Sequence, residues 1–320
     1  MKKTLIRFAL ASGVLLIGCK DAEKQNDVSP LVSSTNARVE NGRIVFNEDF
    51  YTTLLDSSNK DARKAVESLD KSSEFTSLNE FGNDATARKN YRVSGTAAFS
   101  EAELDNYPDF IKNILNPDGV VEIGNNIIRI NLVKEKVYVL NKKHIDSYND
   151  LLAENVSNKK ILVFSTDQEV LSELKKVQNG RTDLLCFSES GAPSLEDKGM
   201  EEFPGFNNLS LRMDNKVVYQ KAGIYFSLQS KIKLDYKNSL GLWANIDGVS
   251  GISYQYQYKP KCKSEISRQY GESKPSGATS EHNFRPYESA STALHKLYFS
   301  CTFLAAPFKS ARNYTINHRY

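Results

Sequence analysis

Long hydrophobic runs are missing from most of this chain of 320 residues, whose mean hydropathy is −0.48. The apolar run Phe8–Ile17 is the one that draws attention, and it is too short to cross a bilayer as a helix. Cysteine, methionine, tryptophan and histidine are scarce, with 4, 3, 1 and 4 residues respectively. The sequence therefore predicts neither a membrane-spanning helix nor a protein rich in metal ligands.

The usual catalytic and cofactor motifs are also absent from the sequence. It contains no HExxH, no CxxC, no GxSxG elbow, no P-loop and no Rossmann glycine pattern. The four histidines have no ligand-like spacing: His144, His282, His295 and His318. We therefore predict no metal and no cofactor, and an enzyme becomes the weaker functional class.

The charge balance argues against nucleic acid as a partner. The chain has 42 basic and 39 acidic residues, a formal net charge of +3 and a pI near 8.4. Three of the basic residues are Lys2, Lys3 and Arg7, and without them the two counts are equal. Nucleic-acid-binding domains need a concentrated basic surface. A neutral mature chain offers no basis for one.

The N-terminus has the pattern of a secretory signal. Positive residues precede the apolar run, and the run ends in Leu16-Ile17-Gly18-Cys19. This ending resembles the lipobox of bacterial lipoproteins. The resemblance implies that residues 1–18 are removed, that the Cys19 thiol carries a diacylglyceryl group and that the new amine is acylated. An ordinary secretory signal or a cytosolic helix is the alternative. Each buried methylene contributes about 0.8 kcal/mol, so two chains anchor a protein stably in a lipid bilayer.

Residues 19–38 are expected to form a flexible tether. They are polar and rich in Ser and Asn, and their reach as a random coil is about 25 Å. Lys20-Asp21 with Glu23 resembles the acidic stretch of surface-exported lipoproteins of Bacteroidota, although a generic solvated linker fits equally well. We expect a lipid-anchored protein of the cell envelope, on the outer membrane, with its periplasmic or surface face left open.

Residues 39–190 are expected to form a mixed α+β module. Helices are predicted from Asn47, over Lys60–Leu69, from Pro108 and over 166–177. The turn Asn116-Pro-Asp-Gly119 precedes three predicted strands of a meander, at 120–123, 127–132 and 137–140, and further strands are predicted at 161–164 and 183–187.

Residues 191–320 change to a period of two, which is typical of an antiparallel β-sandwich. Alternating apolar residues predict strands at 209–213, 224–228, 232–236, 240–246, 252–258, 294–304 and 314–320, with an exposed loop at 271–280. The predicted fold class is thus α+β, a small mixed module followed by a sandwich.

Three patches resemble exported lipoproteins of Bacteroidota. They are Glu40-Asn-Gly-Arg-Ile-Val-Phe46, Ser73-Glu-Phe-Thr-Ser-Leu78 and Pro108-Asp-Phe-Ile-Lys-Asn-Ile-Leu-Asn-Pro-Asp-Gly119 with its continuation to Gly124. The sequence departs from the pattern at Val120 and Ile128, where an acidic and an aromatic residue are usual. The resemblance covers residues 40–140. It implies the class of protein, its cell compartment and a mixed module followed by a β-rich part. It assigns no functional residues to this sequence.

The cysteines besides Cys19 allow a disulfide. Cys262 and Cys301 flank the long loop in the β-rich half, and a bond between them would contribute about 3–4 kcal/mol in the loop-entropy model. Two separate buried thiols are the equal alternative. Cys186 lies in an apolar stretch and is expected to be a small buried hydrophobe.

The most suggestive constellation is aromatic. Tyr254, Tyr256 and Tyr258 alternate with glutamines, so their rings share one face of a strand, and Trp243 lies one predicted strand earlier. The four rings could form a platform for a ligand such as a glycan. The alternative, which strand composition favours, is that they cover the core of the sandwich.

The leading functional hypothesis is a membrane-anchored, non-catalytic binding or structural protein of the cell envelope, with a glycan or an envelope protein as partner. One alternative is a cell-envelope hydrolase acting on glycan or peptide from a cleft between the two halves, through carboxylates or Cys186. The other is a pilus-like subunit that donates the strand Tyr314–Tyr320.

Overall fold

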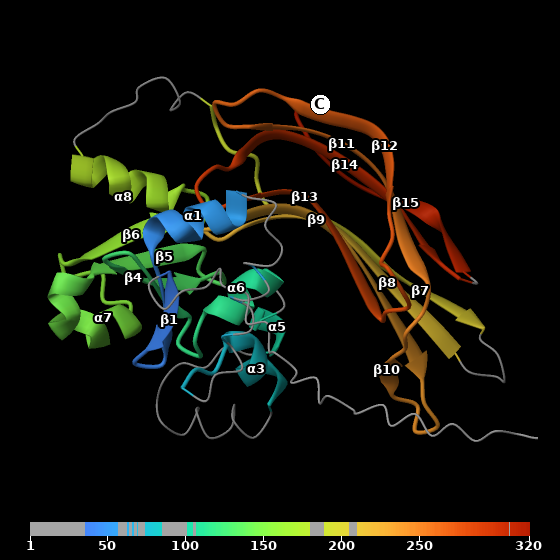
Figure 1. Ribbon diagram of the computed structural model, residues 1–320, viewed down its shortest axis with the longest axis horizontal. Coiled ribbons are helices and arrows are strands. Elements are labelled where there is room, and N and C mark those ends of the chain that lie inside the picture. The colour runs from blue at the N-terminus through green and yellow to red at the C-terminus, as the bar shows by residue number, and fades with distance from the viewer. Residues whose placement is uncertain are drawn as a thin grey trace, which may run out of the picture.

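The chain folds mainly into β-strands that build three sheets in the described residues, with few and short helices (Figure 1). The computed structural model describes residues 36–56, 63, 66, 69, 74–84, 101–104, 107–179, 189–204, 210–306 and 308–320. Among these residues no helix is both long and apolar enough to cross a membrane. The predicted signal peptide, nearly all of the tether and the strand predicted at 183–187 lie outside them.

The N-terminal part is organised around a six-stranded sheet in the order β1-β2-β3-β4-β5-β6. Its strands are β1 (Ala37–Glu40), β2 (Arg43–Phe46), β3 (Val120–Ile123), β4 (Asn126–Asn131), β5 (Lys136–Asn141) and β6 (Ile161–Ser165). Neighbours are antiparallel except β2 and β3, which are parallel. The predicted meander is therefore confirmed as β3–β5.

Short helices cover both faces of this sheet. They are α1 (Glu48–Asp56), α3 (Leu78–Asn83), α5 (Glu101–Leu104), α6 (Asp109–Ile114), α7 (Tyr148–Leu152), α8 (Val170–Asn179) and the 3₁₀ segment η2 (Lys142–Ser147). Asn47 caps α1 as expected, since its Oδ1 accepts from Phe50 N at 3.1 Å. One core lies between the sheet and α1, α3, α6 and α8, and a smaller one lies under α7.

The C-terminal part consists of two antiparallel sheets that pack face to face. The first has the order β10-β9-β8-β7, with β13 also on β9, and the second has the order β12-β11-β14-β15. The strands are β7 (Leu195–Pro204), β8 (Ser210–Lys221), β9 (Phe226–Lys237), β10 (Trp243–Asn245), β11 (Ser250–Pro260), β12 (Ile266–Ser273), β13 (Glu281–Ser289), β14 (Leu294–Ala305) and β15 (Phe308–His318). Buried side chains of both sheets form one core, so the antiparallel sandwich is present.

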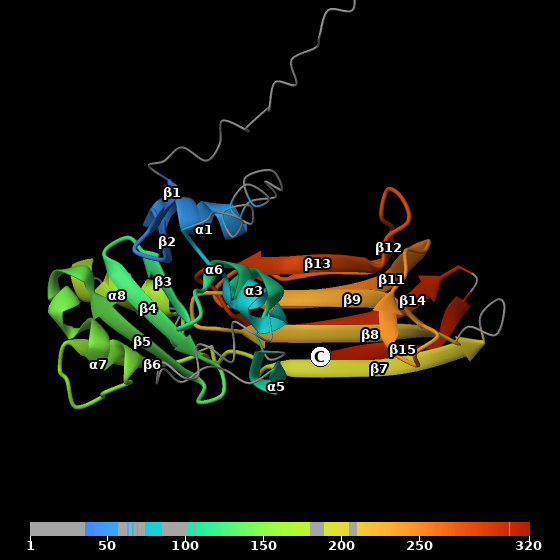
Figure 2. The ribbon, with the colours of Figure 1, turned by 90° about the horizontal axis from the view of Figure 1, so that it is seen from below.

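The two parts lie end to end (Figures 1 and 2), and the core of the N-terminal part includes buried residues from the sandwich. The β8–β9 turn inserts Ile224 and Tyr225 into the core of the N-terminal part, where Tyr51 donates to the Ile224 carbonyl at 3.1 Å. Gly223 has a φ of +75°, and a Cβ there would come within 2.7 Å of Val137 Cγ2. A glycine is needed at this turn because its φ is positive and because the side chains of Val137 and Val170 leave no room for a Cβ.

Several predicted elements were wrong in detail. β8 and β9 form one long hairpin, so the stretch predicted as a strand at 224–228 begins with a turn. The strand predicted at 240–246 is only β10, because a tight turn occupies 238–242. β12 extends to Ser273, so it includes the first residues of the loop predicted at 271–280. The helix predicted over 166–177 begins only at Val170, because a turn precedes it in which Gln168 Oε1 accepts from Ser165 N at 2.7 Å. The predicted β-rich character is confirmed, and the helices of the predicted mixed module are few and short.

Candidate functional site

A cleft of about 780 Å³ lies where α6 meets the sandwich. Its floor is the outer face of β7, β8 and β9, because Met213 and Val217 point into the sandwich core and the residues that alternate with them point away. Ten charged residues are part of its lining: Asp109, Lys112, Glu135, Glu196, Lys198, Asp214, Lys216, Lys221, Lys231 and Lys233.

Three lysines form a row across the floor of this cleft. Lys198 of β7 lies opposite Lys216 of β8, and Lys216 lies opposite Lys231 of β9. Like charges directly opposite each other on neighbouring strands destabilise a sheet. The row therefore requires compensating carboxylates.

Those carboxylates are present, each between two lysines. Glu196 accepts from Lys198 at 3.0 Å and from Lys216 at 2.7 Å. Asp109, at the start of α6, lies 3.1 Å from Lys112 Nζ and 3.3 Å from Lys231 Nζ. These two carboxylates offset the repulsion between the lysines of the row.

The lysines keep two of the cleft acids ionised. Burial raises the pKa of Asp109, but the ammonium groups of Lys231 and Lys112 outweigh burial and hold that pKa below its ordinary value. The pKa of Glu196 is likewise lowered, because hydrogen bonds and charge from Lys216 and Lys198 outweigh burial. Asp214 differs: burial raises its pKa, and the nearby Asp235 adds to the increase.

Aromatic stacking is not available from the two tyrosines of the cleft. Tyr107 and Tyr219 are 1% and 0% exposed. The Tyr107 hydroxyl donates to the Ile130 carbonyl at 3.0 Å, and the Tyr219 hydroxyl accepts from Leu294 N at 2.7 Å. What the cleft offers is a set of paired ammonium and carboxylate groups, which suits a polar ligand that carries groups of both signs.

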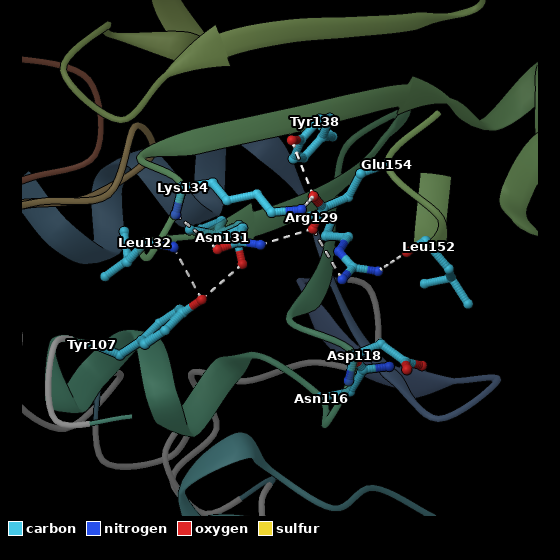
Figure 3. A network of polar contacts seen from close by, with 11 residues as sticks. Tyr107, Asn116, Asp118, Arg129, Asn131, Leu132, Lys134, Tyr138, Leu152 and Glu154 are labelled. Carbon is cyan, nitrogen blue, oxygen red and sulfur yellow. Dashed lines mark hydrogen bonds and ion pairs between the residues drawn. The ribbon is translucent and has the colours of Figure 1, made fainter. Parts of the chain in front are cut away.

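A second polar cluster is centred on Glu154 (Figure 3). Its carboxylate lies 3.2 Å from Arg129 Nη2 and accepts from Lys134 at 2.6 Å, from Asn131 at 2.8 Å and from the Tyr138 hydroxyl at 3.2 Å. Arg129 also donates to the Leu152 carbonyl. These contacts tie the end of α7 to β4 and β5 and occupy the carboxylate fully, so the cluster holds the fold rather than a ligand.

The structure contradicts the aromatic platform. Tyr254 and Tyr258 are only 6% and 5% exposed, and they pack with Tyr256 in the sandwich core. The Tyr254 ring stacks on Phe284 at 3.8 Å between centroids. Trp243 lies in the other sheet, on β10. The three tyrosines face the opposing sheet, because burying large rings is favourable there, so the four rings do not present a common surface.

The predicted bond between Cys262 and Cys301 is also wrong. Cys262 is disulfide-bonded, whereas Cys301 is a free, buried thiol of β14 in the sandwich core. Burial raises the pKa of Cys301 to about 12. Cys301 points into the packed interior because it alternates with outward residues along its strand, a geometry that the loop-length argument did not consider. Cys19 and Cys186 lie outside the described residues.

Two of the four histidines make separate local contacts in the described part of the chain. His282 Nε2 lies 3.0 Å from Ser273 Oγ, and His295 Nδ1 lies 2.8 Å from the Ser190 carbonyl. No three His, Cys, Asp or Glu side chains among the described residues gather closely enough to hold a metal ion.

No family model and no curated protein matches the chain. Among solved structures, it is similar to the crystal structure of a DUF4848 family protein from Bacteroides thetaiotaomicron, with 8% identity over 88% of this chain and 99% of that chain. The TM-score is 0.21, so this likeness carries no argument.

Sequence reasoning did not find the cleft. The alternation of Lys231 and Lys233 with Ile232 and Leu234 could have indicated that these lysines face away from the core. The pairing that aligns Lys231 with Lys216 and Lys198 joins distant segments, however, and no local pattern reports it.

Proposed function

We propose that this chain is a lipid-anchored, non-catalytic protein of the bacterial cell envelope that binds a polar ligand in the cleft between its two parts. The lipobox-like ending at Cys19 supports the anchor and the compartment. The outer membrane is the proposed location, because the sequence patches resemble exported lipoproteins of Bacteroidota.

One observation carries the binding proposal: six lysines and four carboxylates line the cleft, and lysines of three neighbouring strands lie opposite one another on the outer face of the sheet. Such a row costs stability unless it is compensated, and its charges are arranged to meet groups of both signs. Peptide-bearing glycans have this chemistry, since they combine hydroxyls with carboxylates and amines. We therefore propose a glycan that carries charged peptide groups as the ligand class.

The hydrolase alternative is less well supported. A glycan or peptide hydrolase of this kind needs two acids with divergent pKa values facing the same bond. Asp109 and Glu196 are each neutralised by two lysines. The pKa of Asp214 is raised, as that of a general acid would be. The ion pair of this carboxylate is with Arg212, whose Nε lies 3.5 Å from Oδ2, and not with a second catalytic carboxylate.

The pilus-like alternative is also less well supported. The strand that such a subunit would donate is β15, and it pairs with β14 of the same chain from Phe308 to His318. Tyr314 and Ile316 are buried in the sandwich core. Donation would remove both side chains from that core.

The test uses the mature chain and a mixture of peptide-bearing glycan fragments released from bacterial cell walls by a muramidase. Isothermal titration should show saturable binding, and chromatography of the same mixture should show no new product after incubation. Product formation would favour the hydrolase, and absence of binding to these fragments would overturn the proposed ligand class. Mass spectrometry of the N-terminal peptide from the native host tests the anchor separately.

A further inference from the structure

The turn between β9 and β10 holds two leucines out into solvent. Asn238 organises it: its Oδ1 accepts from Leu240 N and from Leu242 N, both at 3.0 Å. Its backbone N donates to the Leu242 carbonyl at 2.8 Å, and Gly241 adopts a φ of +78°. The turn is therefore a built structure rather than a loose loop.

Leu240 is the most exposed of the large hydrophobic residues that the structure describes, and Leu242 is also well exposed. Leu240 is 81% exposed and Leu242 is 62% exposed. Single exposed apolar residues are common on protein surfaces and need no explanation. Here, however, two exposed leucines lie in one rigid turn, and hydrogen bonds hold them away from the core. Together they form a small apolar tip, which does need an explanation.

Basic and aromatic groups lie directly behind this tip. Trp243, the first residue of β10 and the single tryptophan of the chain, is partly buried. The Arg212 guanidinium lies 4.5 Å from the centre of its ring, and Lys237 Nζ lies 5.8 Å from it. Tryptophan and basic side chains at this position, behind exposed leucines, are typical of segments that settle at a membrane–water interface.

We propose that the turn Asn238–Leu242, with Trp243 behind it, inserts shallowly into a lipid surface. Two leucine side chains would bury far less surface than the ~800 Å² per partner that a stable protein interface buries. They suffice for a chain already held near lipid, because burial of two leucines raises partitioning by about a hundredfold. The nearby Asp235 is compensated, since it lies 2.6 Å from Arg212 and 3.4 Å from Lys233.

The single tryptophan makes the test direct. The mature chain is mixed with vesicles of phosphatidylethanolamine and phosphatidylglycerol that carry a doxyl-labelled lipid, and Trp243 fluorescence is recorded. We expect quenching by the doxyl lipid and protection from aqueous iodide. The double variant L240S/L242S stays at the vesicles through the same lipid anchor and should lose the quenching of Trp243.

The matched control is Val156→Ser, at a residue of the N-terminal part that is 65% exposed. This variant should be quenched like the unchanged chain. Thermal melting of each variant confirms that it folds. Equal quenching in L240S/L242S and in the unchanged chain, or no quenching in either, would overturn the proposal. Because the cleft is not involved, its ligand can fail the earlier test without affecting this result.

Discussion

Asp109 at the start of α6 and Lys231 of β9 form an ion pair across the cleft, with 3.3 Å between Oδ2 and Nζ. The two residues are 122 positions apart, and their pairing joins the N-terminal part to the sandwich. Lys231 also lies 2.8 Å from Glu281 of β13. The same side chains thus line the proposed ligand site and connect the two halves that form it.

The first prediction concerns the strength of that connection. Because Asp109 is 41% exposed, solvent screens the pair, and the coupling energy in a double-mutant cycle of Asp109→Asn and Lys231→Gln should be about 0.5–1 kcal/mol. Urea unfolding measures it. A coupling energy of zero would show that the pair does not join the halves.

The pH dependence of that coupling has a definite sign. The folded pKa of Asp109 lies below its ordinary value, so the stabilisation is complete above the ordinary value of about 4. It should fall as the pH drops through the lowered folded pKa. The Asp109→Asn variant should lack this component of the acid transition, which urea unfolding at a series of pH values would measure.

Removing the charge of Glu154, at the centre of the polar cluster in Figure 3, should change the stability of the chain more strongly. Glu154→Gln should lower the free energy of unfolding by about 2–3 kcal/mol, because the Arg129 guanidinium would stay buried without its counter-charge. Glu202→Gln, at an exposed residue of β7, serves as the control and should change stability by less than about 0.5 kcal/mol. Similar melting temperatures for both variants would contradict the role given to Glu154.

A pair of glycine substitutions tests the buried position of Tyr254. A Cβ on Gly271 would lie 2.5 Å from Cζ of the Tyr254 ring, whereas a Cβ on Gly277 meets nothing within 4 Å. Gly271→Ala should therefore destabilise the chain by about 1–3 kcal/mol, and Gly277→Ala should be nearly neutral. If the ring were instead a surface platform, it would move aside and the two variants would melt alike.

The cysteine assignment gives a chemical prediction. Cys301 should resist iodoacetamide in the folded chain, since burial raises its pKa and removes access, and should react fully after unfolding without reductant. Cys301→Ala should leave the disulfide of Cys262 intact in non-reducing peptide mapping. A Cys262–Cys301 peptide in the map would contradict the structure.

Local patterns in the sequence predicted the local structure well. Asn47 capped a helix, the meander formed as β3–β5, and alternation identified the strands that carry Tyr254 and Tyr314. Alternation also showed that the three tyrosines of β11 share a face, but it could not decide which face the opposing sheet covers. That choice depends on Phe284 of β13, whose strand the sequence analysis did not predict.

The candidate site was harder to foresee, for a physical reason. The lysine row needs the register of β7, β8 and β9, and the compensation of Lys231 needs α6, which lies more than one hundred residues earlier. Likewise, the inward direction of Cys301 follows from strand register and not from the length of a loop. Long-range pairing decides such features, and local periodicity does not report them.

The central claim is that the charged cleft binds the ligand. Isothermal titration of muramidase-released glycan fragments into the double variant Lys216→Gln/Lys231→Gln should show affinity at least about tenfold weaker than for the unchanged chain, corresponding to about 1.4 kcal/mol. Lys263→Gln, at an exposed lysine outside the cleft, should bind as the unchanged chain does. Equal affinity in the double variant would contradict the account.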